Sequence, residues 1–182
     1  MKIVQLDVAS ADSVEAASKI TQAMIPDGLD VLISNAGISK GLEPVLSLSD
    51  DLYLEHFVVN TLGPIGLVRA SHSLLDKKAT KGVLAVTSIV GSVGMVMPEF
   101  TSGYGLSRAG LNYSFRRLQQ ELSPEGYSVA RAHPGLVASD MRQAFYEGLE
   151  PEIRKQVSLI APDESASAIV QNVLQELKNQ EL

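Results

Sequence analysis

The chain has 182 residues, 45% hydrophobic and 20% charged, and this ordinary globular composition excludes disorder as its main state. Its 15 basic and 21 acidic side chains give a formal charge of −6, which argues against nucleic acid as a partner. Cysteine is absent, so disulfides, thiol nucleophiles and Cys-ligated metals are excluded. The three histidines lack the spacing of metal ligands, and we expect no metal site.

Targeting and membrane signals are weak. The N-terminus reaches Asp7 before any apolar stretch long enough for a signal peptide. The longest uncharged run lies between Lys81 and Glu99, contains several Ser and Gly residues, and falls short of the ~20 apolar residues that a membrane span needs. The sequence therefore predicts a soluble, cytoplasmic protein.

Short apolar runs alternate with longer amphipathic ones. In chain order, the short apolar runs predict strands over residues 2–6, 29–34, 83–87 and 127–132. The amphipathic runs predict helices over residues 10–24, 49–75, 102–122, 140–148 and 162–177. This alternation predicts an α/β protein with a parallel sheet, in which ligands bind beyond the carboxyl ends of the strands.

Three unusual segments lie at those strand ends: Asn35-Ala36-Gly37, Thr87-Ser88 and Pro134-Gly135. Tyr104 and Arg108, four residues apart on a predicted helix, share one face. A tyrosine hydroxyl is a poor acid or base near neutral pH, but a fixed cation nearby favours its phenolate. A strand-end serine such as Ser88 can donate a hydrogen bond to a carbonyl under reduction. Taken alone, each of these features is more often an ordinary surface or strand-end residue.

Pro64 lies inside an otherwise helical pattern and lacks the N–H that would bond the carbonyl of Asn60. That carbonyl is therefore free to hold a water molecule or another donor. The alternative interpretation is an ordinary helix kink.

Together these positions resemble the short-chain dehydrogenase/reductase family in its single-domain form, and the resemblance spans the chain from Asp7 to about Leu177. The matching segments, in order, are Asp7-Val8, Asn35-Ala36-Gly37, Asn60, Thr87-Ser88 with Gly91, Tyr104-Gly105-Leu106-Ser107-Arg108-Ala109, and Pro134-Gly135-Leu136-Val137-Ala138-Ser139-Asp140-Met141. Within the family, the sequence is most similar to carbonyl reductases and ketoreductases. The resemblance implies a Rossmann-like, doubly wound parallel sheet in one domain over residues 1–182.

The resemblance also implies roles for individual residues. Tyr104 would be the general acid/base, Ser88 the hydrogen-bond partner of the substrate carbonyl, and Asn60 the holder of a proton-relay water. The implied cofactor is NAD or NADP, with a small carbonyl compound or alcohol as substrate. The residues implied to contact the cofactor are Asp7, Val8, Asn35, Ala36, Gly37, Tyr104, Arg108, Pro134, Gly135, Val137 and Ser139.

One departure from the family pattern concerns chemistry. Arg108 stands where the family has Lys. Arginine keeps the positive charge, but its guanidinium is bulkier and does not deprotonate, so we expect reduced catalysis. Ser88 is also farther from Tyr104 in sequence than usual, and Ser92 is a less favoured substitute for it.

A second departure concerns the chain ends. No glycine-rich strand–turn–helix precedes Asp7, and the chain stops where relatives usually continue into a last strand. We therefore expect an N-terminally incomplete sheet that lacks its first two strands. In such a sheet residues 29–34 would form an exposed edge, and we expect residues 2–6 to pair with it or a partner chain to cover it.

Two functions remain open at this point. The first is an NAD(P)-dependent oxidoreductase that interconverts a carbonyl and a secondary alcohol by hydride transfer. The second is a truncated or degenerate, non-catalytic relative that acts as a binding or dimerisation module. The resemblance implies a homo-oligomer formed through the helices that carry Asn60 and Tyr104, with no membrane or nucleic-acid partner.

Overall fold

The computed structural model describes residues 1–95, 101–141, 146, 151–155 and 158–174. Its first half contains α1 (Ala11–Met24), β1 (Val31–Ser34), α2 (Asp50–Phe57), the π-helical segment η1 (Val58–Leu62) and α3 (Gly63–Leu75). Its second half contains β2 (Gly82–Val86), η2 (Ile89–Gly91), α4 (Ser102–Leu122), η3 (Ser123–Glu125), β3 (Ser128–Ala132), α6 (Pro151–Arg154), α7 (Pro162–Ile169) and η4 (Val170–Leu174). The predicted helix over residues 140–148 falls largely outside the described residues.

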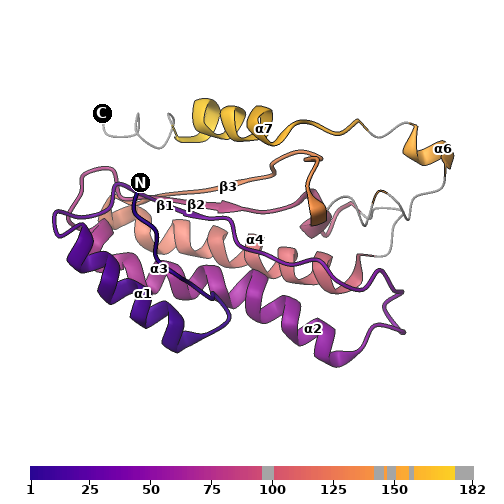
Figure 1. The fold of residues 1–182 in the computed structure, drawn as a ribbon, viewed down its shortest axis with the longest axis horizontal. Helices are drawn as coiled ribbons and strands as arrows, with labels where there is room; N and C mark the ends of the chain where they lie inside the picture. The colour runs from indigo at the N-terminus through magenta and orange to yellow at the C-terminus, as the bar shows by residue number, and fades with distance from the viewer. Residues whose placement is uncertain (96–100, 142–145, 147–150, 156–157, 175–182) are drawn as a thin grey trace.

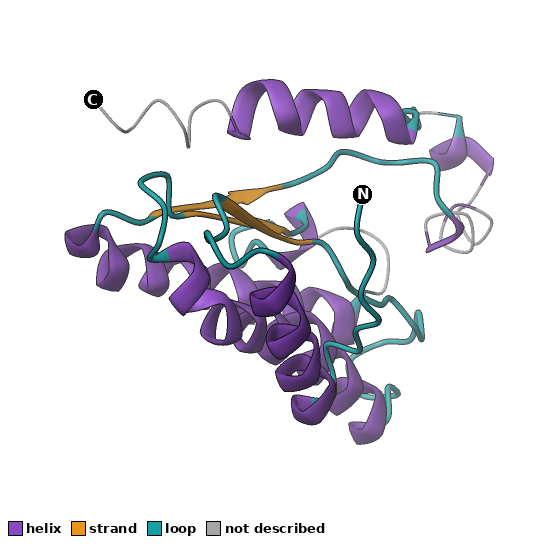
Figure 2. Ribbon diagram, turned by 60° about the vertical axis from the view of Figure 1, so that its left-hand side comes forward, coloured by secondary structure: helices purple, strands orange, loops and turns teal. Residues whose placement is uncertain are grey.

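Within the described residues, β1, β2 and β3 form a parallel sheet in the order β1-β2-β3. The register pairs Val31 with Gly82 and Gly82 with Ser128, so the three strands begin side by side. Helices α1 to α4 lie on one face of the sheet and α7 lies on the other (Figures 1 and 2). Helices on both faces of a parallel sheet confirm the predicted Rossmann-like α/β fold.

The main core lies between the sheet and the helices α3 and α4. Leu75 from α3, Leu111 and Phe115 from α4, and Val83 from β2 are all at most 1% exposed. In β2 (Gly82–Val86) the first four residues are buried and all but Gly82 are aliphatic, as a central parallel strand requires. The predicted helix over residues 102–122 is confirmed at both ends, because its apolar stripe faces this core throughout.

The long helix predicted over residues 49–75 is present but not uniform. Ser49 caps its start, since its side chain accepts a hydrogen bond from the backbone N–H of Leu52. Between α2 and α3 the chain forms the π-helical segment η1, which contains Asn60 and ends just before Pro64. The missing N–H of Pro64 therefore coincides with a local widening of the helix, a feature frequently found at functional sites.

The strand predicted over residues 2–6 is wrong. These residues are irregular, and Ile3 is 79% exposed. Among the described residues β1 pairs with β2 alone, so the expected pairing of residues 2–6 with residues 29–34 is not formed. An isolated extended segment has no neighbour for its backbone N–H and C=O groups, which here remain open to solvent.

The last helix is confirmed over α7 and continues into η4, while residues 175–182 lie outside the described residues. The segment that follows β3 is attached to the start of α7. A single parallel bridge joins Val137 to Ile160, and the Ser165 hydroxyl donates to the Pro134 carbonyl at 2.6 Å. No helix in the described part of the chain combines the length and apolar character that membrane crossing demands.

Candidate active site

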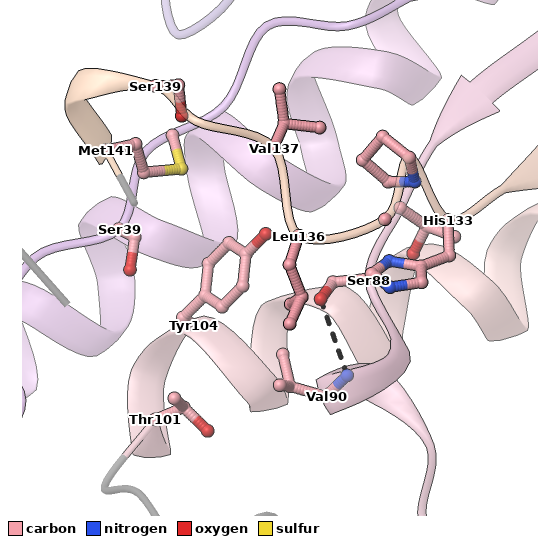
Figure 3. A pocket seen from close by; sticks show the side chains of 13 residues that line it. Ser39, Ser88, Val90, Thr101, Tyr104, His133, Leu136, Val137, Ser139 and Met141 are labelled. Atoms are coloured by element: carbon pink, nitrogen blue, oxygen red, sulfur yellow. Dashed lines mark hydrogen bonds between the residues drawn. The ribbon is translucent and has the colours of Figure 1, made fainter. Parts of the chain in front are cut away.

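A cavity of about 130 Å³ opens at the carboxyl ends of β2 and β3. This is the edge of the sheet where parallel α/β folds bind ligands. Four separate segments supply its walls: the loop after β1, the end of β2 with η2, the start of α4, and the loop after β3 (Figure 3). The lining residues are Ser39, Thr87, Ser88, Val90, Thr101, Tyr104, His133, Pro134, Gly135, Leu136, Val137, Ser139 and Met141.

Tyr104 and Ser88 both line this cavity, from α4 and from the end of β2 (Figure 3). Ser88 begins the short turn η2, where its hydroxyl accepts a hydrogen bond from the Val90 backbone N–H at 3.4 Å. The second predicted serine, Ser92, is exposed and does not line the cavity. The structure therefore brings together the two hydroxyls that the sequence predicted to share a substrate, and it favours Ser88 over Ser92.

Asn60 is fully buried behind the cavity and does not line it. Its Oδ1 accepts from the Ile38 N–H at 2.8 Å, and its Nδ2 donates to the Ile38 carbonyl at 2.9 Å. The same Nδ2 donates to Ser107 Oγ at 3.0 Å, and Ser107 in turn donates to the Tyr104 carbonyl at 2.7 Å. The side chain of Asn60 thus connects the loop after β1 with the helix that carries Tyr104.

Arg108 lies beneath Tyr104 and is only 4% exposed. Its guanidinium carbon is 5.0 Å from the centre of the Tyr104 ring, and its Nη1 donates to the Val86 carbonyl at 3.2 Å. The buried Nε has no hydrogen-bond partner among the described residues. The cation therefore stacks on the tyrosine ring, as cation–π pairs do, and keeps one unsatisfied donor.

Two glycines make room for Arg108. A Cβ atom at Gly37 would collide with Nη2 of Arg108 and lie 3.0 Å from Oδ1 of Asn60. A Cβ at Gly91 would lie 2.6 Å from the Arg108 backbone carbonyl carbon. Neither position can hold a larger residue unless α4 or the arginine side chain moves, so the glycines of both motifs fix the approach of their loops to α4.

The loop after β3 has a defined shape. Gly135 adopts a φ of +83°, and a Cβ at this position would lie 2.6 Å from Cδ1 of Ile160. The Ala138 N–H donates to the Ile160 carbonyl, and the Ile160 N–H donates to the Leu136 carbonyl, each at 2.9 Å. This bracing holds Pro134, Gly135, Val137 and Ser139 along the cavity wall.

The other residues implied to contact a cofactor lie apart from the cavity. Asp7 and Val8 are next to the start of α1, where the Asp7 carboxylate accepts from the Ala9 N–H at 2.9 Å. Asn35 and Ala36 are exposed directly after β1. None of these four residues lines the cavity, and neither do Gly37 and Arg108.

Sequence reasoning missed several polar groups at the site. Thr101 and His133 line the cavity without having been assigned a role. Asn112 connects the Thr87 hydroxyl, which donates to it at 2.7 Å, with the Gly91 carbonyl, to which it donates at 3.3 Å. Asn112 lies one helical turn beyond Arg108 on the same face of the helix, and this spacing could have indicated that it belongs to the site.

Two groups at the opposite end of the sheet, Asp76 and Tyr127, have shifted pKa values. The Tyr127 hydroxyl donates to Asp76 at 2.9 Å and thereby lowers the pKa of that carboxyl. Burial, followed by the same contact with Asp76, raises the pKa of Tyr127 above its ordinary range. Within the ranges described above, no three carboxylate or imidazole side chains gather as metal ligands.

Comparisons with known proteins agree with this geometry. The sequence profile described as short chain dehydrogenase matches residues 1–150. An uncharacterised oxidoreductase of Schizosaccharomyces pombe is 35% identical over 176 residues, which are 94% of this chain and 69% of that protein.

Two solved structures are also similar. The NADPH-bound carbonyl reductase from chicken fatty liver superimposes with a TM-score of 0.82 at 25% identity, covering 93% of this chain and 68% of that one. The carbonyl reductase Sniffer of Drosophila melanogaster gives a TM-score of 0.81 at 24% identity, covering 94% of this chain and 69% of that one. At 24% identity, the similarity to the Drosophila structure shows a shared fold alone.

Proposed function

Because the chain belongs to the short-chain dehydrogenase family, we propose that it is an NAD(P)-dependent oxidoreductase that interconverts a carbonyl compound and a secondary alcohol. The observation that carries this proposal is the shared cavity of Tyr104 and Ser88 at the carboxyl edge of the sheet. The carbonyl-reductase likeness of the fold supports the same reaction class. We further infer that residues 1–182 act as one domain and that the protein works in the cytoplasm.

The residues around the cavity fit a nicotinamide group. The braced loop after β3, in which Gly135 has a positive φ, lines the same cavity as the hydroxyls of Ser88 and Tyr104. When bound, the cofactor supplies the hydride. Pro134, Gly135, Val137 and Ser139 would hold the ring.

In this mechanism Ser88 donates a hydrogen bond to the substrate carbonyl, and Tyr104 delivers the proton to the same oxygen as reduction proceeds. Arg108 stacks on the Tyr104 ring and holds that side chain from below. Asn60 acts through the Ile38 loop and Ser107, which fix the turn of α4 on which Tyr104 lies.

Calorimetric titration of the purified chain with NADPH and with NADH tests the proposal. We expect binding of at least one of the two in the micromolar to millimolar range, about 4–8 kcal/mol of binding free energy. Absence of heat with both cofactors at millimolar concentration would contradict an oxidoreductase role for this chain.

A second candidate is a non-catalytic binding module, favoured by one observation. Arg108 stands where the family has Lys, and its Nε is buried without a partner in the described part of the chain. A guanidinium cannot release a proton to a relay, so a chain that binds cofactor but never turns over would fit this candidate.

We also propose a homo-oligomer formed through the helices that carry Asn60 and Tyr104. A groove of about 420 Å³ runs between α3 and α4, and Tyr113 on its rim is 70% exposed. A second copy of the chain would cover this groove with the same surface, as two-fold interfaces do. Light scattering should then give a mass of at least twice 19.5 kDa, and a monomer at all concentrations would contradict it.

A further inference from the structure

His56 is fully buried one helical turn before Asn60, and neither the motifs nor the proposed mechanism uses it. Its Nδ1 lies 2.7 Å from the Leu52 carbonyl, and its Nε2 lies 3.0 Å from the Lys40 backbone nitrogen. A carbonyl only accepts and a backbone N–H only donates. The contacts therefore define the neutral tautomer with the proton on Nδ1 and the lone pair of Nε2 directed at Lys40.

His56 and Asn60 hold the same loop at alternate residues. Asn60 binds both backbone groups of Ile38, and His56 binds the N–H of Lys40. The intervening residue, Ser39, lines the cavity near Tyr104 (Figure 3).

The imidazole ring also contacts the start of α4. A Cβ atom at Gly103 would lie 3.1 Å from Nδ1 of His56 and 2.8 Å from Cδ2 of Leu48. Gly103 is therefore packed directly onto the ring, and it is the residue immediately before Tyr104. One buried side chain thus contacts both the loop that presents Ser39 and the turn that presents Tyr104.

We propose that His56 is a positioning residue that sets the placement of Tyr104 against Ser39 across the cavity. An apolar side chain of similar volume would leave the Lys40 N–H unpaired, and the loop would leave the helix to reach water. This inference rests on the proposed carbonyl reduction, because the placement it describes serves the proton transfer from Tyr104.

Three variants separate positioning from simple packing. His56→Leu keeps volume but removes the acceptor, and His56→Gln restores an acceptor at similar reach. Lys40→Ala is the matched control, because it removes the exposed ion pair with Glu55 and keeps the backbone N–H. With NADPH and a ketone, we expect kcat of His56→Leu to fall about tenfold at nearly unchanged cofactor KM, as expected when a reacting group is displaced. His56→Gln and Lys40→Ala should stay close to the wild type.

A second readout does not need activity. In NMR spectra of protein labelled on its tyrosine rings, with Tyr104→Phe to assign the signal, His56→Leu should shift the Tyr104 resonance and speed the exchange of the Lys40 amide. The Gln variant should restore both. Gly103→Ala adds a Cβ against Leu48 and the His56 ring, so it should also shift Tyr104, and it replaces His56→Leu if that variant does not fold.

Each outcome decides the inference. A Tyr104 signal unmoved in His56→Leu and Gly103→Ala, or equal loss of kcat in the Leu and Gln variants, would overturn it. If the wild-type chain shows no turnover with either cofactor, the proposed function fails, whereas the NMR comparison still decides whether His56 places Tyr104.

Discussion

Arg108 is the residue on which the chemistry of the site depends most visibly. Its guanidinium stacks on the Tyr104 ring, reaches the Val86 carbonyl and leaves Nε without a partner among the residues described. A lysine at this position would carry a compact charge without the Nε donor and could pass a proton.

We therefore expect Arg108→Lys to raise kcat by roughly tenfold, less than a full general acid–base contribution, because Tyr104 itself is retained in both proteins. Steady-state oxidation of NADPH with a ketone, followed by absorbance, measures the change. Arg117→Lys on the same helix is the control, since Arg117 is exposed and paired with Glu121. An Arg108→Lys rate equal to or below the wild-type rate would show that the arginine does not limit turnover.

Single residues of the site were predictable only through the ordered motifs that contain them. Taken alone, Tyr104 and Ser88 are each more often ordinary residues; the family resemblance selected both, and the structure places both on one cavity. The role of His56 was not predictable, because it depends on a backbone N–H at Lys40, and every residue except proline has one.

At the scale of elements, a polar cluster at the opposite end of the sheet from the site joins the end of α3 to the start of β3. Asp76, just after α3, accepts from Tyr127, pairs with Lys81 at 3.3 Å, and lies 3.1 Å from Nδ1 of His72. The hydrogen bond from Tyr127 is the main cause of the lowered pKa of Asp76, and Lys81 and His72 add to it. The ionised carboxylate is therefore favoured in the folded state.

The lowered pKa of Asp76 makes the stability of the folded protein depend on pH. Because the pKa of Asp76 is lower in the folded state, its stabilisation is present above the unfolded value of about 4 and is lost as the pH falls through the folded value. Asp76→Asn should lower the urea midpoint at pH 7, and its difference from the wild type should shrink toward pH 3. Asp30→Asn, whose contact with Lys78 is 3.8 Å, serves as the control. A difference that is constant with pH would contradict the account.

Elements were predictable where a core-facing stripe runs their whole length. The helix over residues 102–122 meets this condition through Leu111 and Phe115, and its predicted ends are those of α4. The strand over residues 2–6 failed because an apolar run forms a strand only beside a partner, which the run itself does not encode. Pro64 indicated where the helix would be irregular, but the sequence did not predict that the irregular segment η1 is π-helical. A missing N–H permits several local geometries.

At the scale of the molecule, the parallel sheet brings four distant segments to one edge. Ser39, Ser88 and Gly135 follow β1, β2 and β3, and Tyr104 lies in the first turn of α4, yet all four line one cavity. The alternation of strands and helices was sufficient to predict this convergence, because parallel strands place all their carboxyl ends together. The depth of Asn60 and Arg108 behind the cavity was not predictable, because it depends on how closely α4 packs against the loops.

The central claim is that Tyr104 protonates a carbonyl while a nicotinamide cofactor reduces it, and turnover of Tyr104→Phe against Tyr113→Phe tests it most directly. Tyr113 lies on the same helix, is 70% exposed and does not line the cavity. With NADPH or NADH and a ketone, we expect Tyr104→Phe to lose at least about a hundredfold in kcat. Tyr113→Phe should keep the wild-type rate. Equal kcat values in all three proteins would contradict the claim.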